Sequence, residues 1–465
     1  MALQKIGISG YRGFNEHRVM EFAVPNGSDG SGLTIITGAN NSGKSTILES
    51  IRARTGHQLS FTAGARNAIK DYVSIDYHID GEVERIRSLS PGPSEVVKEN
   101  AREQKMFVLP SRRAFDPYFG KSTRERDDYT RAYGLPPQRS NVIQEFSSRL
   151  FKILKNPNSF NDLTEEALGF RPVWTIDQTD QGNFFLKFYN AGASHSSDGM
   201  GEGIVSIFAI MDALHDSIEG ELIAIDEPEL SLHPSLQKRV SKILSRYAKD
   251  RQIVVSTHSP YFVNIEALSR GAHLSRIARG GEGTDIFELT KEAKAAIEKL
   301  STGNLYNPHV LGLNAREIFF QEDGIVLTEG QEDVVLYPKV IKKIGIDIQA
   351  NFFGWGVGGA DNMIHFSEIF SSLGFQKVVG LLDGDRRHQL SRLTEKFPNF
   401  YFAAIPAADI RTKPPRPATE AVEGLLNENL ELRPGFEREV ADLFADVSDY
   451  LAGKVGRPGL TPATS

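Results

Sequence analysis

The chain has 465 residues, of which 40% are hydrophobic and 24% charged, a balance typical of globular proteins with room for two or three domains. It contains no cysteine, which excludes disulfides, thiolate nucleophiles and cysteine-ligated zinc or iron–sulfur centres. The net charge of −7 excludes a general attraction to nucleic acid, although local basic clusters can still form a binding face. Since we find neither a signal-peptide pattern nor an apolar run of ~18 residues, we expect a cytoplasmic protein that does not enter a membrane.

A strand, a glycine loop and a helix are predicted in succession near the N-terminus, after strand-like segments at 6–14 and 19–23. The apolar run 33–37 leads into Gly38-Ala-Asn-Asn-Ser-Gly-Lys-Ser-Thr46, which has the spacing of a P-loop. Its glycines let backbone N–H groups face a polyphosphate, its lysine reaches the β and γ phosphates, and its serine hydroxyl binds Mg²⁺. We therefore predict an ATP or GTP site formed by Asn40, Asn41, Ser42, Gly43, Lys44, Ser45 and Thr46.

Residues 111–182 are predicted to form a mainly helical insertion. A charged run at 121–131 is followed by apolar residues at helical spacing, among them Phe146, Leu150 and Ile153. A strand-like segment at 184–189 follows the insertion.

Two further apolar strands end in polar residues suited to nucleotide hydrolysis. Glu221-Leu-Ile-Ala-Ile-Asp-Glu-Pro228 brings Asp226 to the Mg²⁺ beside Ser45 and places Glu227 where it can polarise a water molecule. The strand at 252–256 ends in Thr257 and His258. A histidine in such a place is either a phosphate sensor or an ordinary loop or core residue.

The Asp-Glu-Pro motif with the following 229–234 segment resembles the Walker B motif and D-loop of ABC-type and SMC-type ATPases. This resemblance implies that His258 is the switch histidine that senses the γ phosphate. Arg12 resembles the arginine that these ATPases keep near the nucleotide. The alternative role for Arg12 is a surface ion pair.

ABC-type sites are completed by a signature segment from a second protomer, which implies a dimer. The small polar run 196–203 precedes a helical pattern at 204–214, so its backbone N–H groups could meet an anion at a helix start. We take Ser197 and Gly199 as the signature residues that bind nucleotide, although the run departs from the usual form. The alternative is an ordinary helix cap.

A second chemistry is predicted from residue 323 onward. One short apolar strand ends before Glu329 and Asp333, and another, at 377–382, ends in Asp383 and Asp385. Parallel strands bring these four carboxylates to one edge of a sheet, where ligands of open α/β sheets bind. Oxygen ligands favour Mg²⁺ or Mn²⁺, which can activate water for attack on a phosphodiester, whereas Asp-Gly-Asp alone is typical of a tight turn.

The Glu-Gly-x-x-Asp motif, the glycine loop at 353–360 and Asp-Gly-Asp together resemble the Toprim domain. An ABC-type ATPase followed by Toprim resembles the OLD (overcoming lysogenization defect) family of ATP-dependent nucleases. That resemblance implies a homodimeric prokaryotic defence or repair protein that cleaves DNA with two metal ions, although the sequence leaves RNA open as a substrate and a second defence protein open as a partner.

The same resemblance implies roles for single residues. Glu329 and Asp333 would serve one metal ion and Asp383 and Asp385 the other. The segment 410–423 would complete the site with Lys413, Glu420 and Glu423. Lys413 would stabilise the transition state or contact phosphate, and phosphate contact is equally open to Arg411 and Arg416.

We therefore predict an α/β protein with an ABC/SMC-like ATPase domain at 1–290, a connection at 291–322, a smaller Toprim-like domain with a parallel sheet at 323–455 and a disordered tail at 456–465. The alternative function is an ATP-driven sensor or scaffold of a defence complex, whose Toprim-like domain is inactive or recruits a separate effector. An SMC-like structural protein would need long heptad arms, and a primase usually brings a zinc site.

Overall fold

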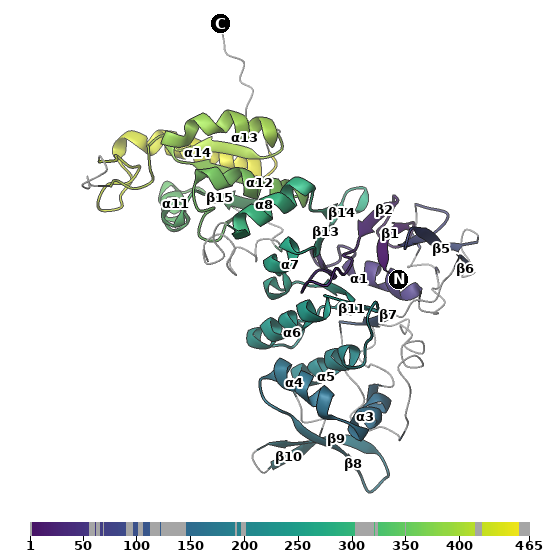
Figure 1. Cartoon of the computed structure of the whole chain (residues 1–465). Helices are drawn as coiled ribbons and strands as arrows, with labels where there is room; N and C mark the ends of the chain where they lie inside the picture. Colours follow the sequence, from purple (N-terminus) through teal and green to yellow (C-terminus); the bar gives the residue numbers. More distant parts are fainter. Residues whose placement is uncertain are drawn as a thin grey trace. The chain divides into compact units, whose positions relative to one another are not determined.

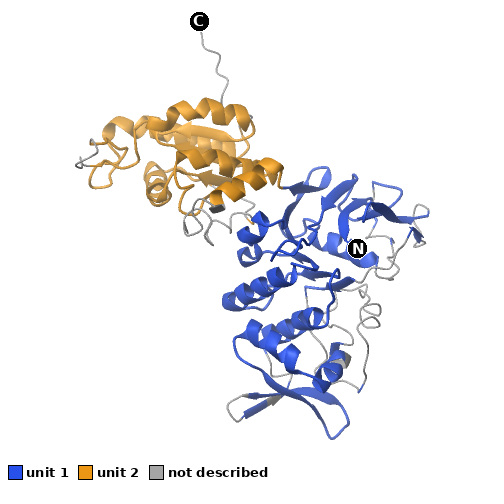
Figure 2. Ribbon diagram, in the orientation of Figure 1, with its two compact units in different colours: residues 1–288 blue, residues 289–465 orange. Residues whose placement is uncertain are grey.

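The computed structural model divides the chain into two compact units, Met1–Glu288 and Leu289–Ser465 (Figure 2). It describes residues 2–54, 61, 66–67, 69–89, 96–100, 106–111, 121, 146–190, 193–196, 201–302, 320, 324–348, 350–413 and 421–454. The predicted tail at 456–465 lies outside these residues, as do most of the predicted connection at 291–322 and most of 111–145.

Unit 1 is built around a six-stranded sheet in the order β14-β13-β3-β12-β11-β7 (Figure 1). All neighbours are parallel except β13 and β14, which form a hairpin. Strands β3, β11 and β12 are buried along their whole length, which explains why apolar residues dominate each of them. The strands are β3 (Leu33–Thr37), β7 (Met106–Leu109), β11 (Leu222–Asp226), β12 (Gln252–Ser256), β13 (His273–Gly280) and β14 (Gly283–Glu288).

A five-stranded antiparallel sheet in the order β2-β1-β4-β5-β6 completes the nucleotide-binding part of unit 1. Helix α1 contacts β7, β11 and β12, and β2 contacts β14, so the two sheets share one body. The elements are β1 (Leu3–Ser9), β2 (Arg18–Glu21), β4 (Ser74–Ile79), β5 (Glu82–Ser88), β6 (Val96–Glu99), α1 (Lys44–Ala53), α5 (Glu202–His215), α6 (Pro234–Tyr247) and α7 (Ile265–Ser269), with a 3₁₀ turn η2 (Pro260–Phe262).

The described part of the predicted insertion contains the helices α3 (Phe146–Lys155) and α4 (Asn158–Leu168) and one strand, β8. This strand belongs to a three-stranded antiparallel sheet in the order β10-β9-β8, in which β9 corresponds to the strand predicted at 184–189. Its strands are β8 (Val173–Gln178), β9 (Phe184–Asn190) and β10 (Ala193–Ser196). Helix α4 ends at its C-cap, Gly169, whose φ of 84° stops the helix and whose N–H donates to the Glu165 oxygen at 2.7 Å, before β8 begins.

A buried ion pair attaches α3 to α5. Arg149 Nη2 lies 3.0 Å from Asp212 Oδ1 and 2.6 Å from Asp216 Oδ2, and the side chains of Arg149 and Asp212 are 1% and 0% exposed. Such a pair is satisfied only while both partners are present, because an isolated charge at this depth is costly.

Replacing Arg149 by methionine is therefore expected to destabilise unit 1 by about 3–5 kcal/mol, since it leaves the Asp212 carboxylate buried without its guanidinium. Urea unfolding measures this loss. Arg171→Met is the matched control, because Arg171 makes exposed ion pairs with Asp162 and Glu165, which add little stability, so this variant should unfold near the wild-type urea midpoint. Equal losses in the two variants would contradict a role for the buried pair.

Unit 2 has a four-stranded parallel sheet in the order β16-β15-β17-β18. Its strands are β15 (Gly324–Leu327), β16 (Ala350–Phe352), β17 (Val378–Leu382) and β18 (Tyr401–Ala404). Helices α11 (Gln331–Ile344), α12 (Met363–Ser372), α13 (Leu390–Lys396) and α14 (Glu437–Leu451) accompany them, with the 3₁₀ turns η4 (Ala360–Asn362), η5 (Gly384–Gln389) and η6 (Pro434–Phe436). Helix α8 (Lys291–Thr302), in the predicted connection, contacts α12 and belongs to unit 2.

Both units thus have the predicted α/β class with a parallel sheet. Among the described residues, no helix is both long enough and apolar enough to cross a membrane.

Candidate functional site

The P-loop connects β3 to α1 and encloses a space suited to phosphate. Gly38 and Gly43 have φ angles of 139° and 116°, which side chains rarely adopt, and a Cβ on Gly38 would lie 2.1 Å from the Ile277 oxygen. Lys44 is 4% exposed, and its Nζ donates to the Gly38 and Ala39 oxygens, each at 2.9 Å. These carbonyls hold the ammonium at the loop that a polyphosphate would enter.

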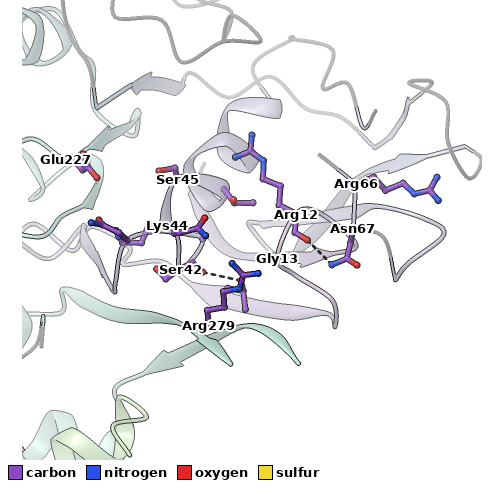
Figure 3. A pocket seen from close by; sticks show the side chains of 14 residues that line it. Arg12, Gly13, Ser42, Lys44, Ser45, Arg66, Asn67, Glu227 and Arg279 are labelled. Atoms are coloured by element: carbon purple, nitrogen blue, oxygen red, sulfur yellow. Dashed lines mark hydrogen bonds between the residues drawn. The ribbon is translucent and has the colours of Figure 1, made fainter. Parts of the chain in front are cut away.

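A pocket of about 630 Å³ opens over this loop (Figure 3). Arg12 lines it and forms an ion pair with Glu49 at 2.6 Å, which is the alternative that the sequence left open for this arginine. Every predicted P-loop residue from Asn40 to Thr46 takes part in the lining, which consists of Arg12, Gly13, Asn40, Asn41, Ser42, Gly43, Lys44, Ser45, Thr46, Arg66, Asn67, Glu227, Arg279 and Thr284.

The end of β11 meets the start of α1 at a place suited to Mg²⁺. Ser45 Oγ donates to Asp226 Oδ2 at 3.1 Å, and Asp226 Oδ1 accepts from the Ser256 hydroxyl. A hydroxyl and a carboxylate in contact are a fitting pair of oxygen ligands for a nucleotide-bound Mg²⁺, which usually keeps several waters.

Glu227 and His258 face each other beside the pocket. Glu227 has a φ of 46°, a strained conformation for glutamate, held by its N–H donating to the Ser256 oxygen at 2.8 Å. His258 Nε2 lies 3.7 Å from Glu227 Oε1. Burial and the nearby Lys44 ammonium lower the pKa of His258, although Asp226 acts against them, so the imidazole is neutral at pH 7.

Glu229, which sequence reasoning did not single out, positions His258. Its carboxylate accepts from the His258 backbone N–H at 2.6 Å and from Thr257 Oγ1 at 2.8 Å. Burial raises the pKa of Glu229, against the effect of these hydrogen bonds. Glu229, which follows the Asp-Glu-Pro motif, therefore ties its segment to the end of β12, where His258 lies.

Three polar residues of the pocket, Arg66, Asn67 and Arg279, were also missed. Arg279 comes from the β13–β14 hairpin, which is fixed to the loop because Thr284 donates its N–H to the Gly13 oxygen at 2.8 Å and its hydroxyl to the Ser42 oxygen at 3.2 Å. The turn signal Gly280-Gly-Glu-Gly283 predicts a hairpin, but nothing in the sequence indicates its partner.

Replacing Arg279 by alanine is expected to weaken ATP binding about 10-fold, because an exposed guanidinium on the pocket wall can form charge-assisted hydrogen bonds with phosphate. Titration with a fluorescent ATP analogue measures the change. Arg87→Ala is the control, since Arg87 makes an exposed pair with Glu99 and does not line the pocket. Equal affinities of Arg279→Ala and Arg87→Ala would exclude a contact to the nucleotide.

The predicted signature residues Ser197 and Gly199 lie outside the described residues. The helix expected after them is present as α5.

In unit 2, the four predicted carboxylates gather where β15 and β17 end. Glu329 follows β15, and its Oε1 accepts from the Asp383 backbone N–H at 2.8 Å. Asp333, 5% exposed, caps α11 by accepting from the Gly330 N–H at 2.8 Å. Asp385 lies in η5 with its side chain 57% exposed.

The glycine loop reaches the same edge of the sheet. The N–H groups of Gly358 and Gly359 both donate to the backbone carbonyl oxygen of Glu329, at 3.0 and 2.8 Å. A Cβ on Gly356, whose φ is 83°, would lie 2.7 Å from the Gly330 backbone. The loop therefore holds the Glu329-Gly330 turn in place.

The carboxylates repel one another and are partly removed from water. Burial, together with the charges of Asp333 and Glu329, raises the pKa of Asp383 to about 8. Burial likewise raises the pKa of Asp333 to about 6 and also raises that of Glu329. Asp383 Oδ1 is buried and has no hydrogen-bond partner among the residues that the structure describes. A cation would satisfy this oxygen and relieve the repulsion.

The cluster fits Mg²⁺ or Mn²⁺ in donor chemistry but is not a closed cage. Within the described ranges, the only three acidic or histidine side chains with ligand atoms all within 4.8 Å of one another are Glu21, His273 and Glu288 of unit 1. Mg²⁺ is commonly held by one or two carboxylates and several waters, so a trio at that spacing is not required.

Asp409, which was missed, is the fifth carboxylate of this site. It follows β18, and its charge acts on Glu329, Asp333 and Asp383. Lys413, predicted to be catalytic, forms an ion pair with Asp409, and this contact raises the pKa of Lys413 although burial acts against it. The sequence did contain a signal for Asp409, because this carboxylate follows β18, a third parallel strand, and ligands bind where such strands end.

The remaining predicted residues are placed differently. Arg411 pairs with Glu332 at 2.7 Å. Glu423, predicted as a metal ligand, is 79% exposed and pairs with Arg433 at 3.3 Å. Glu420 and Arg416 lie outside the described residues.

Two family models match the chain in succession. Residues 76–264 match "AAA domain, putative AbiEii toxin, Type IV TA system", a region that contains Asp226 and His258 but begins after the P-loop. Residues 319–385, which contain Glu329, Asp383 and Asp385, match the overcoming lysogenization defect protein-like TOPRIM domain.

Curated relatives and solved structures match parts of the chain. The Old nuclease of Escherichia phage P2 is 27% identical over 34% of this chain and 27% of its own length, and the OLD nuclease of Thermus scotoductus is 28% identical over 36% and 31%. The chain thus aligns with less than a third of each relative. The SMC head domain from Thermotoga maritima is 15% identical, with a TM-score of 0.36 over 62% of this chain and 100% of that one.

The order of domains that the sequence resemblance implied is confirmed: the chain carries an AAA-type ATPase domain followed by an OLD-like TOPRIM domain.

Proposed function

We propose that this protein is an ATP-binding and ATP-hydrolysing endonuclease of the OLD type that cleaves DNA with divalent metal ions. The observation that carries the proposal is the carboxylate cluster around a buried Asp383 oxygen, Oδ1, that has no hydrogen-bond partner within the described part of the chain. Such a cluster is costly in a folded domain unless cations occupy it. Two of the relatives are named nucleases, which supports the same reading.

The ATPase part binds ATP with Mg²⁺. Lys44 and the loop N–H groups hold the phosphates, and Ser45 and Asp226 hold the ion. Glu227 polarises the attacking water, and neutral His258 beside it contacts the γ phosphate. By analogy with ABC-type sites, Ser197 and Gly199 of a second copy complete the site, so the protein acts as a homodimer through its ATPase domains.

In the TOPRIM part, Glu329, Asp333, Asp383 and Asp385 hold Mg²⁺ or Mn²⁺, and Asp409 adds a further carboxylate. The bound ions supply an activated water and charge stabilisation for phosphodiester cleavage. Lys413, held by Asp409, is placed to contact a phosphate oxygen. We further propose that the biological role is prokaryotic anti-phage defence, as the OLD resemblance implies.

Nicking of supercoiled plasmid by the purified protein tests the proposal, with Mg²⁺ or Mn²⁺, with and without ATP, and with an RNA substrate in parallel. Metal-dependent nicking that an Asp383→Ala, Asp385→Ala double variant loses, with its ATP hydrolysis unchanged, is the expected result. Cleavage of RNA alone would correct the substrate.

The open spacing of the carboxylates favours one alternative, an ATP-driven sensor or scaffold whose TOPRIM domain is inactive or recruits a separate effector. Intact ATP hydrolysis without metal-dependent cleavage of either nucleic acid would support this alternative and overturn the nuclease.

A further inference from the structure

A row of basic side chains directly follows the carboxylates of unit 2. Arg386, Arg387 and His388 are consecutive and exposed in η5, and Arg392, also exposed, follows in α13. We call these four residues the η5 basic track. None of them belongs to the motifs from which the metal site was predicted.

Backbone contacts fix turn η5, which carries three residues of the track, beside the metal-binding edge. Gly384, at the start of η5, donates its N–H to the Ala407 oxygen at 2.9 Å, and a Cβ there would lie 2.4 Å from that oxygen. Arg387 Nη2 donates to the Ile405 oxygen at 3.4 Å. Turn η5 is therefore attached to the segment that leads from β18 to Asp409, and its basic residues remain beside the carboxylates.

The charge of Arg386, the first residue of the track, reaches the site but contributes little to holding the fold together. Arg386 Nε lies 3.8 Å from Asp385 Oδ2, with the two side chains 46% and 57% exposed, so the pair adds little stability. The charge of Arg386 nevertheless acts on the Glu329 carboxyl. Among the residues that the structure describes, neither Arg387 nor Arg392 forms an ion pair with a carboxylate.

A phosphodiester chain is the ligand whose charge and chemistry match this arrangement. A polyanion that approaches five carboxylates is repelled unless cations accompany its path, and guanidinium groups bind phosphate in bidentate geometry. Contacts of this kind position a backbone without reading bases.

We propose that the η5 basic track binds the sugar–phosphate backbone of a nucleic acid and leads it to the TOPRIM carboxylates, independently of base sequence. This inference rests on the proposed nuclease function and names the surface that would hold its substrate.

Binding of a labelled DNA duplex to the full-length protein tests the track. The protein carries Asp383→Asn and the buffer contains EDTA, so that the duplex is not cleaved during the measurement. The Arg387→Glu, Arg392→Glu double variant keeps Arg386 beside Asp385. We expect its affinity to fall at least about 10-fold, and the slope of log K against log salt between about 50 and 200 mM to become shallower by about 2.

The matched control is Lys342→Glu, Lys343→Glu, which makes the same change in charge on exposed residues in the last turn of α11. It should leave the affinity near that of the parent. Equal losses in the two double variants, a track variant with unchanged affinity and slope, or a parent that binds no duplex would each overturn the track. Tight, track-dependent binding without cleavage in the metal-loaded wild type would instead contradict the nuclease and leave the track standing.

Discussion

Replacing Asp383 by asparagine is expected to abolish metal-dependent cleavage and, at the same time, to raise the thermal stability of the metal-free protein. The two effects share one cause. Burial and the charges of Asp333, Glu329, Asp409 and Asp385 raise the pKa of Asp383 to about 8, so ionising this group costs free energy in the folded state. An amide removes that cost and also removes a ligand for the metal.

Cleavage should fall by at least about 10³-fold, as expected when a group that binds the catalytic metal is lost. The unfolding midpoint of unit 2 without metal should rise by about 2 °C or more. Adding Mn²⁺ or Mg²⁺ should stabilise the wild type but stabilise the variant much less, because binding to the folded state alone raises stability. Differential scanning calorimetry in EDTA and in each metal measures both shifts.

The control for this experiment is Asp442→Asn, which removes an exposed carboxylate from α14 that pairs with Arg438 at 4.0 Å. It should change neither cleavage nor the response to metal. A lower melting temperature for metal-free Asp383→Asn would show that the carboxylate is satisfied by protein groups, and the argument for a cation site at this edge would fail.

The sequence was most informative where a short motif determines a local structure. The P-loop follows from residue types at fixed spacing, because only glycine tolerates the φ angles at Gly38 and Gly43. Strand ends were equally readable, since an apolar run that stops at Asp226 or Asp383 gives the place where a parallel sheet presents its ligands.

Contacts between distant segments were not readable from the sequence. Arg279 enters the pocket only because the β13–β14 hairpin is hydrogen-bonded to Gly13 and Ser42, and no local pattern encodes that pairing. Asp409 joins the carboxylates because β18 lies beside β17. The exposed pair of Glu423 with Arg433, at 3.3 Å, is a further contact that no local pattern indicated.

Replacing Glu227 by glutamine is expected to leave ATP binding nearly unchanged while lowering ATP hydrolysis by about 10²–10³-fold. Glu227 lies on the pocket wall in a strained conformation, with φ at 46°, and does not hold the Mg²⁺ pair of Ser45 and Asp226. An amide keeps the shape but cannot accept a proton from the attacking water. Lys44→Ala, in contrast, should lose binding itself, because its ammonium reaches the phosphates.

Steady-state hydrolysis and nucleotide titration separate these two variants from each other and from His258→Ala. If His258 were the base, Glu227→Gln would retain most of its rate and His258→Ala would not. The lowered pKa of His258 keeps the imidazole of the nucleotide-free protein neutral from pH 7 to 8, so its titration should not change kcat/KM for ATP hydrolysis in that range.

The Glu227→Gln variant also shows which nucleotide state controls cleavage. If ATP binding activates the TOPRIM site, this variant should nick plasmid at least as fast as the wild type in ATP, because it remains in the ATP-bound state. If hydrolysis is required, its nicking should fall together with its ATPase rate, while Lys44→Ala is inactive in both cases. Nicking by Lys44→Ala at the wild-type rate would show that the two domains act independently, and a regulatory role of ATP would be excluded.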